Sequence, residues 1–208
     1  MRSTRSLVTV VAAAVLTTTA AAQETVELVT ADSVTIVTHV YPVAGTPRGV
    51  ILAFHQGGGN GRGEYAPIAA RLNGLGYAVV APDLRAGGNR FDGVNETVRR
   101  AGREAPYCEA MPDLRAVSAW AERRWPGIPR ILWGSSFSGA LVLRHAALDS
   151  SGAVGVLAFS PASGGPMAEC RGEDVADRIT IPVLALRPAS EMEIESVRSQ
   201  HEGFLRSG

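Results

Sequence analysis

The sequence contains no lysine, so all 20 of its basic residues are arginines, and they are balanced by 20 aspartates and glutamates. The formal net charge is therefore zero, and no block of basic residues appears along the chain. These features argue against a nucleic-acid partner, whose usual footprint is a clustered basic patch. We interpret the arginine-only composition as the signature of a GC-rich genome and expect a bacterial source.

Cysteine is also scarce, since Cys108 and Cys170 are the only two. Neither has another cysteine or a histidine at ligand spacing, which argues against a catalytic or metal-binding role for these two cysteines. Both cysteines lie in segments rich in glycine and proline, where a bridge would tie two long loops together. Disulfides persist in the oxidising environment that an exported chain meets, and we predict Cys108 and Cys170 as a candidate disulfide.

One uncharged apolar run, residues 7–16, lies near the N-terminus between two arginines and three alanines that end at Ala22. It is shorter than the roughly 20 residues that a membrane span needs, so no stable membrane anchor is expected. The pattern predicts a secretory signal peptide over residues 1–22, cleaved before Gln23, and an exported protein, periplasmic or secreted. Residues 23–208 are predicted to form one domain, because 46% hydrophobic content allows a full core.

Strand and helix patterns alternate along this domain. Residues 25–30 and 33–41 predict an antiparallel pair. Further strands are expected at 49–54, 77–81, 130–133, 154–159 and 182–186, helices at 64–75, 112–125, 136–148 and 191–205, and long loops at 83–109 and 160–178. The alternation predicts an α/β fold, with a mostly parallel central sheet covered by helices on both faces. Functional residues are then expected at the carboxyl ends of the strands.

The most informative segment is residues 131–143, where an apolar strand pattern meets a turn of small residues and a helix pattern follows at once. Ser136 lies at the tip of this turn, two residues after Gly134. This arrangement is typical of a nucleophile elbow, which exposes a serine hydroxyl above a sheet. The usual fifth residue is glycine, whereas this chain has Ser138 there and Gly139 one place later. The alternative is a strand-to-helix turn without chemistry.

Four segments, in this order and spacing, resemble the α/β-hydrolase superfamily, and most of all its dienelactone-hydrolase-like branch. They are Phe54–Gly59, Tyr65–Arg85, the Ser136 elbow, and Ile181–Leu186 followed by acidic residues. The resemblance covers nearly all of residues 25–208. It implies a serine hydrolase that needs no metal or organic cofactor and acts on a small-molecule ester or a related carbonyl compound.

The resemblance assigns a role to several residues. It implies Ser136 as the nucleophile and the amide of Phe137 as one donor of an oxyanion hole, with the second donor at Gly57 or, as the alternative, Gln56. The acid is expected at Glu191, with Glu193 as the alternative. The other interpretation of these glutamates is an acidic first turn of a helix, which favours negative charge.

The base is the part that the sequence does not supply. The order in this superfamily is serine, acid, histidine, and only His201 follows Glu191, inside a predicted helix. His55 is expected to order the oxyanion loop, His145 to point away from the site and His39 to be a surface or packing residue. We therefore expect a domain incomplete at its C-terminus, lacking the last strand, the histidine and a helix, or else a member without a base. A protein with this sequence, without a catalytic histidine, is expected to be severely impaired in hydrolysis.

Three functions remain open at this point. The first is a serine esterase, the second a non-catalytic binding protein of the same fold, and the third a thioester or peptide-bond hydrolase.

The loop at 83–109 carries five arginines, which either bind a carboxylate on the substrate or belong to a solvated loop. They are Arg85, Arg90, Arg99, Arg100 and Arg103.

Overall fold

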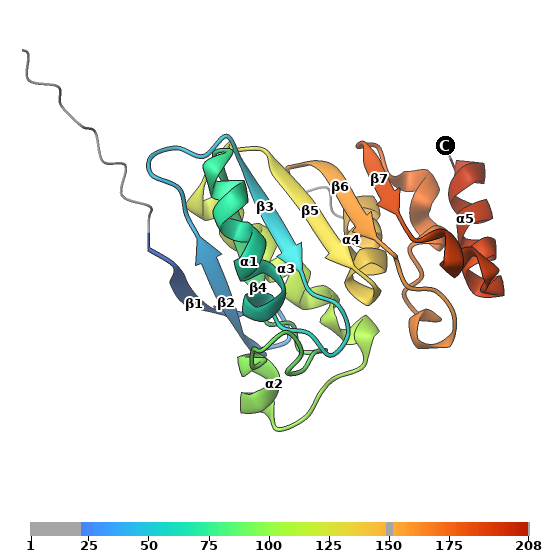
Figure 1. Cartoon of the computed structure of the whole chain (residues 1–208), viewed down its shortest axis with the longest axis horizontal. Helices are drawn as coiled ribbons and strands as arrows, with labels where there is room; N and C mark the ends of the chain where they lie inside the picture. The colour runs from blue at the N-terminus through green and yellow to red at the C-terminus, as the bar shows by residue number, and fades with distance from the viewer. Residues whose placement is uncertain (1–21, 149–151, 208) are drawn as a thin grey trace, which may run out of the picture.

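The structure is a computed structural model that describes residues 22–148 and 152–207. The predicted signal peptide, apart from Ala22, lies outside these residues. Within them, seven strands form one sheet in the order β1-β2-β4-β3-β5-β6-β7 (Figure 1). The strands are β1 (Glu24–Val29), β2 (Thr35–Tyr41), β3 (Gly49–Phe54), β4 (Tyr77–Pro82), β5 (Arg130–Ser135), β6 (Ala153–Phe159) and β7 (Val183–Leu186).

The first two strands form the antiparallel end of the sheet. β1 pairs antiparallel with β2, and β2 pairs antiparallel with β4, whereas β4, β3, β5, β6 and β7 run parallel. All six residues of β3 are buried, because this strand lies in the middle of the sheet with helices on both faces. The predicted α/β fold with a mostly parallel sheet is therefore confirmed.

Helices cover the two faces of the sheet unequally (Figure 1). On one face α1 (Gly61–Gly74) packs Tyr65 and Ala69 against β3 and β4. On the other face α3 (Met111–Arg124) and α4 (Phe137–Leu148) contribute to the larger core cluster. The other helices are α2 (Glu96–Ala101), α5 (Glu195–Ser207) and the 3-10 turns η1 (Tyr107–Ala110), η2 (Gly165–Met167), η3 (Glu173–Arg178) and η4 (Ala189–Glu193). None of the helices in the described residues is long and apolar enough to cross a membrane.

The structure corrects three of the predicted segments, one of which is the loop predicted over 160–178, where η2 and η3 form. The segment 83–109 is not all loop, because the Asn95 side chain accepts a hydrogen bond from the Val98 amide and starts α2 there. The helix predicted over 191–205 is broken at Ile194, which is extended and separates η4 from α5. The Arg198 guanidinium donates to the carbonyls of Met192 and Glu193 beside this break.

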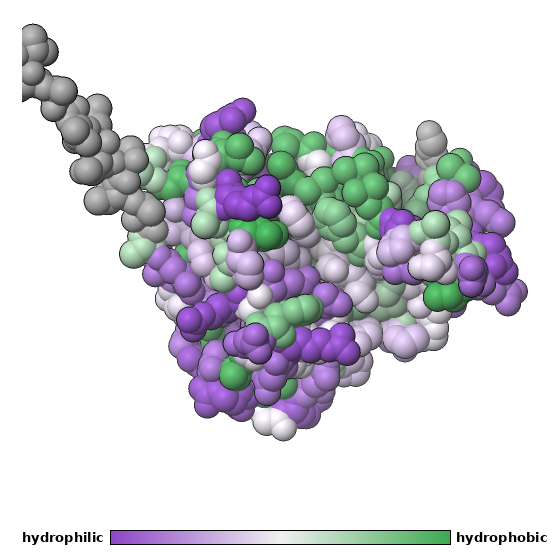
Figure 2. All heavy atoms as spheres, viewed as in Figure 1, coloured by the Kyte–Doolittle hydropathy of each residue, from purple (hydrophilic) through white to green (hydrophobic). Residues whose placement is uncertain are grey.

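One region of the sheet is left open on the face that carries α1. Trp133 contacts Tyr65 of α1, and its ring lies 5.0 Å from that of Phe159 on the next strand. In register with β6, β7 then adds Leu184 and Leu186, which are 50% and 47% exposed. Figure 2 shows hydrophobic residues gathered over this region, between α1 and α5. Among the described residues, no helix covers this part of the face.

Candidate active site

The elbow predicted around Ser136 is a tight turn between β5 and α4. Ser136 has a φ of 57°, a left-handed conformation that is uncommon outside glycine. Its amide donates to the Phe159 carbonyl at 2.9 Å, and its carbonyl accepts from the Ala162 amide at 2.9 Å. A Cβ on Gly134 would lie 2.3 Å from the Ser138 carbonyl oxygen, so the turn requires a glycine at this position.

The serine that replaces the usual glycine at position 138 has a structural function. The Ser138 hydroxyl lies 2.7 Å from the Phe54 carbonyl at the end of β3 and 2.9 Å from the Ser135 carbonyl. It also accepts a hydrogen bond from the Ser135 amide at 2.9 Å. This hydroxyl is fully buried and fastens the elbow to the central strand of the sheet. The variant motif is therefore compatible with the elbow geometry.

Ser136 opens onto a cavity of about 440 Å³ at the carboxyl ends of β5, β6 and β7. Glu191 of η4 lines the same cavity, whereas Glu193 does not. The structure thus brings the predicted nucleophile and the preferred acid to one cavity. The other polar lining residues are Gln56, Ser135, Ser160, Ser163, Arg187 and Ser196.

Arg187 accompanies Glu191 in this cavity and was not predicted from the sequence. One of its Nη atoms lies 3.7 Å from Glu191 Oε2, and the side chain is only 11% exposed. The other Nη donates to the Pro161 carbonyl at 3.2 Å and to Gln200 Oε1. Burial lowers the pKa of Arg187, although the charge of Glu191 opposes this effect. The guanidinium is therefore held in place beside the carboxylate.

The turn after β3 carries the two candidate amides for the second oxyanion donor, and one of them is already engaged. The Gln56 amide donates to Glu64 Oε2 at 3.0 Å, so it is already engaged. In the described residues the Gly57 amide has no protein acceptor. The Phe137 amide belongs to the first residue of α4, where helix amides have no partner within the helix. The amides of Gly57 and Phe137 are thus free to donate, whereas Gln56 is the residue of this turn that lines the cavity. Burial raises the pKa of Glu64.

His55 lies under this turn and is completely buried. Its Nδ1 is 2.9 Å from the Gln56 carbonyl, and its Nε2 is 2.9 Å from the Leu84 amide. Because the Leu84 N–H donates to Nε2, the ring is neutral and its Nδ1–H donates to Gln56. Burial lowers the pKa of His55, which favours this neutral form. Both ring nitrogens are occupied, so His55 orders the turn and is not positioned as a base.

The other three histidines do not line the cavity either. His39 is 6% exposed and has its Nε2 3.5 Å from Asp83 Oδ2, so it is a buried residue of β2. His145 is buried and lies 2.8 Å from the Ser118 hydroxyl, between α3 and α4. His201 is exposed on α5. Among the described residues, therefore, Ser136 has no histidine partner.

The arginines of the loop after β4 are mostly paired with protein carboxylates. Arg85 is buried and bonds both Asp113 and Asp32, which lowers the pKa of Asp32. Arg99 pairs with Glu96 and Arg100 with Glu27. These ion pairs within the protein favour the alternative to substrate binding for the three arginines. Arg90, in contrast, is exposed and lies against Gly58 of the turn after β3, and Arg103 is also exposed.

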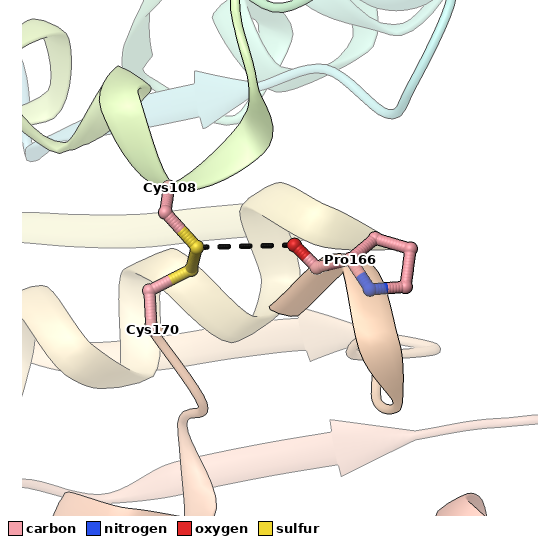
Figure 3. The surroundings of a disulfide bond; sticks show 3 residues. All are labelled: Cys108, Pro166 and Cys170. Atoms are coloured by element: carbon pink, nitrogen blue, oxygen red, sulfur yellow. Dashed lines mark hydrogen bonds between the residues drawn. A yellow bond between two sulfur atoms is a disulfide. The ribbon is translucent and has the colours of Figure 1, made fainter. Parts of the chain in front are cut away.

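The predicted disulfide is present and joins two segments near the site. Cys108 of η1 is bonded to Cys170, which follows η2, with a Cα–Cα distance of 5.6 Å (Figure 3). The Cys108 sulfur also lies 3.8 Å from the Pro166 carbonyl oxygen. A bridged sulfur has no hydrogen to donate, so this approach is a van der Waals contact. The bridge fixes η1 to the loop that follows β6.

Sequence reasoning also missed Tyr107, which precedes Cys108. Its ring is stacked on that of Phe137, with centroids 4.5 Å apart and an interplanar angle of 13°. Tyr107 lies 30 residues away from Phe137 along the chain, so no local pattern indicates their contact. The neighbouring Cys108 was the available signal in the sequence, because a predicted disulfide indicates that the backbone around Tyr107 is fixed.

The described residues contain no group of three or more histidine, cysteine, aspartate or glutamate side chains that could hold a metal ion.

A family model described as serine aminopeptidase, S33, a hydrolase family, matches residues 45–191, which is more than half of the chain. No curated protein matches the sequence.

Solved structures share the fold of this chain. A protein from Klebsiella pneumoniae, assigned provisionally as a dienelactone hydrolase, superposes with a TM-score of 0.67 at 16% identity, covering 90% of this chain and 82% of that one. An esterase from Pyrococcus furiosus gives a TM-score of 0.64 at 16% identity, covering 89% and 79%. At such identities the likeness shows the α/β-hydrolase fold and does not identify a substrate.

Proposed function

Because the chain belongs to the serine aminopeptidase, S33, family of α/β-hydrolases, we propose that it is a serine hydrolase whose nucleophile is Ser136. The substrate is a small molecule that carries an ester or a related carbonyl group. Substrates of this class fit a site with hydroxyl, amide and carboxylate groups around one cavity, because acyl transfer needs a nucleophile and donors for an oxyanion.

The left-handed backbone of Ser136 is the observation that carries the proposal. A non-glycine residue in this conformation costs on the order of 1–3 kcal/mol, and such strain persists where the surrounding structure enforces it. Here the hydrogen bonds to Phe159 and Ala162 and the tight contact at Gly134 enforce it. Ser160 of the same cavity also has a positive φ, 44°, but it follows β6 into a loop, whereas Ser136 stands between β5 and the first residue of α4, as a nucleophile elbow requires.

The neighbouring groups have complementary roles in this proposal. The amides of Gly57 and Phe137 stabilise the negative charge that develops on the carbonyl oxygen when Ser136 attacks. Glu191 is the acid of the site, and Arg187 keeps its carboxylate in place. Because none of the described histidines lines the cavity, turnover by the described residues rests on the oxyanion donors and substrate binding and is expected to be slow.

The same observation about the histidines favours a second candidate, a binding protein without catalysis. A cavity with five serines, an arginine and a glutamate can hold a polar ligand whether or not Ser136 reacts. The two candidates make different predictions about the reactivity of the Ser136 hydroxyl.

Reaction with an alkyl fluorophosphonate, followed by mass spectrometry of peptides, tests the proposal. We expect slow covalent labelling of the wild-type protein at Ser136, none in Ser136→Ala, and wild-type labelling in Ser199→Ala, whose exposed serine lies on α5. Thermal unfolding verifies that all three proteins are folded. A folded wild-type protein without label would contradict the hydrolase and favour the binding protein.

A further inference from the structure

Tyr107 covers one side of the elbow. It is the first residue of η1, and its ring lies nearly parallel to that of Phe137 at 4.5 Å. The Phe137 ring is completely buried and also meets His55 edge-on, with centroids 6.2 Å apart. Tyr107, Phe137 and His55 therefore form one continuous aromatic layer under the turn after β3 and the start of α4. Stacked pairs of this kind hold the orientation of both rings.

The hydroxyl end of Tyr107 reaches the turn after β3. A Cβ placed on Gly57 would lie 2.6 Å from the Tyr107 oxygen, which is closer than real atoms approach. A glycine at position 57 therefore makes room for this hydroxyl. Within the described residues, the Tyr107 hydroxyl has no hydrogen-bond partner in the protein, and the side chain is only half-buried. A free O–H donor thus lies directly beside the residue whose amide also has no acceptor.

The disulfide fixes this tyrosine from its other side. Cys108 is the next residue, and its partner Cys170 is 4% exposed and packed in the core. The preceding residues are also tied down, since the Ala105 amide donates to the Arg85 carbonyl at 3.0 Å. The backbone at Tyr107 is consequently held by a covalent bond and a hydrogen bond. Such preorganisation is what a donor to a transition state requires.

We propose that the Tyr107 hydroxyl is a third hydrogen-bond donor at the oxyanion site, beside the amides of Gly57 and Phe137. This inference rests on the proposed function of Ser136. When Ser136 Oγ bonds to the carbonyl carbon, the π electron pair moves to the oxygen and the serine proton passes to solvent water. The oxyanion then accepts the hydrogen bond of Tyr107, which keeps its own proton.

Replacing Tyr107 by phenylalanine tests the hydroxyl alone, because the stacked ring remains. Labelling by an alkyl fluorophosphonate places a P–O group where the oxyanion forms, and its kinetics give the maximal rate kinact and the binding constant KI separately. We expect Tyr107→Phe to lower kinact about 10- to 100-fold, with KI and the unfolding temperature unchanged. Tyr77→Phe, which removes a hydroxyl at the start of β4, is the matched control and retains the wild-type kinact.

A second variant separates catalysis from folding. Tyr107→Leu loses the stacked ring as well, so it lowers both kinact and the unfolding temperature, whereas Tyr107→Phe lowers kinact only. If the wild-type protein is labelled at Ser136 and Tyr107→Phe reacts at the same rate, the third donor is refuted and the proposed function stands. If the folded wild-type protein is not labelled at all, both proposals are refuted.

Discussion

At the scale of single residues, His55 connects two loops that follow neighbouring strands. Its Nδ1–H donates to the Gln56 carbonyl after β3, and its Nε2 accepts from the Leu84 amide after β4. Only a neutral imidazole can accept at Nε2, so the pair of hydrogen bonds fixes one tautomer. The shape of the turn that carries Gly57 therefore depends on the charge state of a buried ring.

This dependence predicts that acid weakens the fold. Burial lowers the pKa of His55 in the folded state below its ordinary value of about 6.5, so below that pH the unfolded chain binds the extra proton first. The free energy of unfolding should then fall by up to about 1.4 kcal/mol per pH unit below 6.5, until the folded-state pKa is reached. Urea titrations at pH 7.5, 6.5 and 5.5 measure the slope.

Two variants isolate the contribution of His55. His55→Gln keeps an acceptor for the Leu84 amide but does not titrate, so we expect a smaller slope with pH than in the wild-type protein. His201→Gln removes an exposed histidine on α5 and should leave the slope as it is. Equal slopes in His55→Gln and the wild-type protein would contradict this account.

Individual site residues differ in how far the sequence predicts them. Ser136, Phe137 and Gly134 belong to one short turn, so their arrangement follows from local sterics and could be predicted. Tyr107 and Arg187 reach the site only through folding, and their contacts depend on loops whose paths no local pattern specifies. The preference for Gly57 over Gln56 as the proposed donor likewise needed the structure, because the acceptor that engages the Gln56 amide belongs to Glu64 on α1.

At the scale of elements, the start of α1 crosses β4 in close contact. A Cβ on Gly61 would lie 2.3 Å from the Ala81 carbonyl oxygen, whereas a Cβ on Gly74, at the other end of the same helix, would meet nothing within 4 Å. The Gly61 amide also donates to Asp83 Oδ1 at 2.8 Å, which fixes the helix to the end of β4. The close packing of α1 on the sheet therefore begins at its first residue.

These two glycines form a matched pair for mutation. Gly61→Ala should lower the free energy of unfolding by about 1–3 kcal/mol, because the added methyl group must displace backbone. Gly74→Ala should raise it by about 0.5–1 kcal/mol, because alanine loses less backbone freedom in a helix. Chemical denaturation compares both variants with the wild-type protein. A stabilising Gly61→Ala would show that α1 can shift away from β4.

Strands were easier to predict than the ends of helices. β3 was predicted with its observed bounds because a buried central strand is an unbroken apolar run. The break between η4 and α5 was missed because all residues from 191 to 205 fit a helical pattern. The Arg198 guanidinium donates to the carbonyls at the break. These hydrogen bonds form only in the folded conformation, so the residue pattern does not reveal them.

At the scale of the whole molecule, the disulfide closes a long segment of the chain. Cys108 and Cys170 are 62 residues apart in sequence, and the segment between them includes α3, β5, α4 and β6. The prediction of this pair came from loop composition, and the structure confirms it. The order of the strands in the sheet, in contrast, did not follow from the sequence, because several topologies fit the same alternation of elements.

Opening this bridge should lower the stability of the entire domain. The chain-entropy relation gives about 4 kcal/mol for a loop of this length, as an order of magnitude. We expect dithiothreitol to lower the urea midpoint of unfolding of the wild-type protein. The Cys108→Ser/Cys170→Ser variant should have a lower urea midpoint than the wild-type protein, and dithiothreitol should not change it. A wild-type midpoint that dithiothreitol does not change, with thiol quantification confirming reduction, would contradict this expectation.

The open part of the sheet, with Trp133, Phe159, Leu184 and Leu186, has a consequence for how the protein behaves at boundaries between phases. On the face that Figure 2 shows, this apolar area lies among more polar residues, and a molecule with such a face is amphiphilic. We expect it to adsorb to air bubbles, plastic and oil droplets through this area. In an assay on an emulsified ester, the measured rate will therefore depend on droplet area and on added detergent, as well as on the chemistry of Ser136.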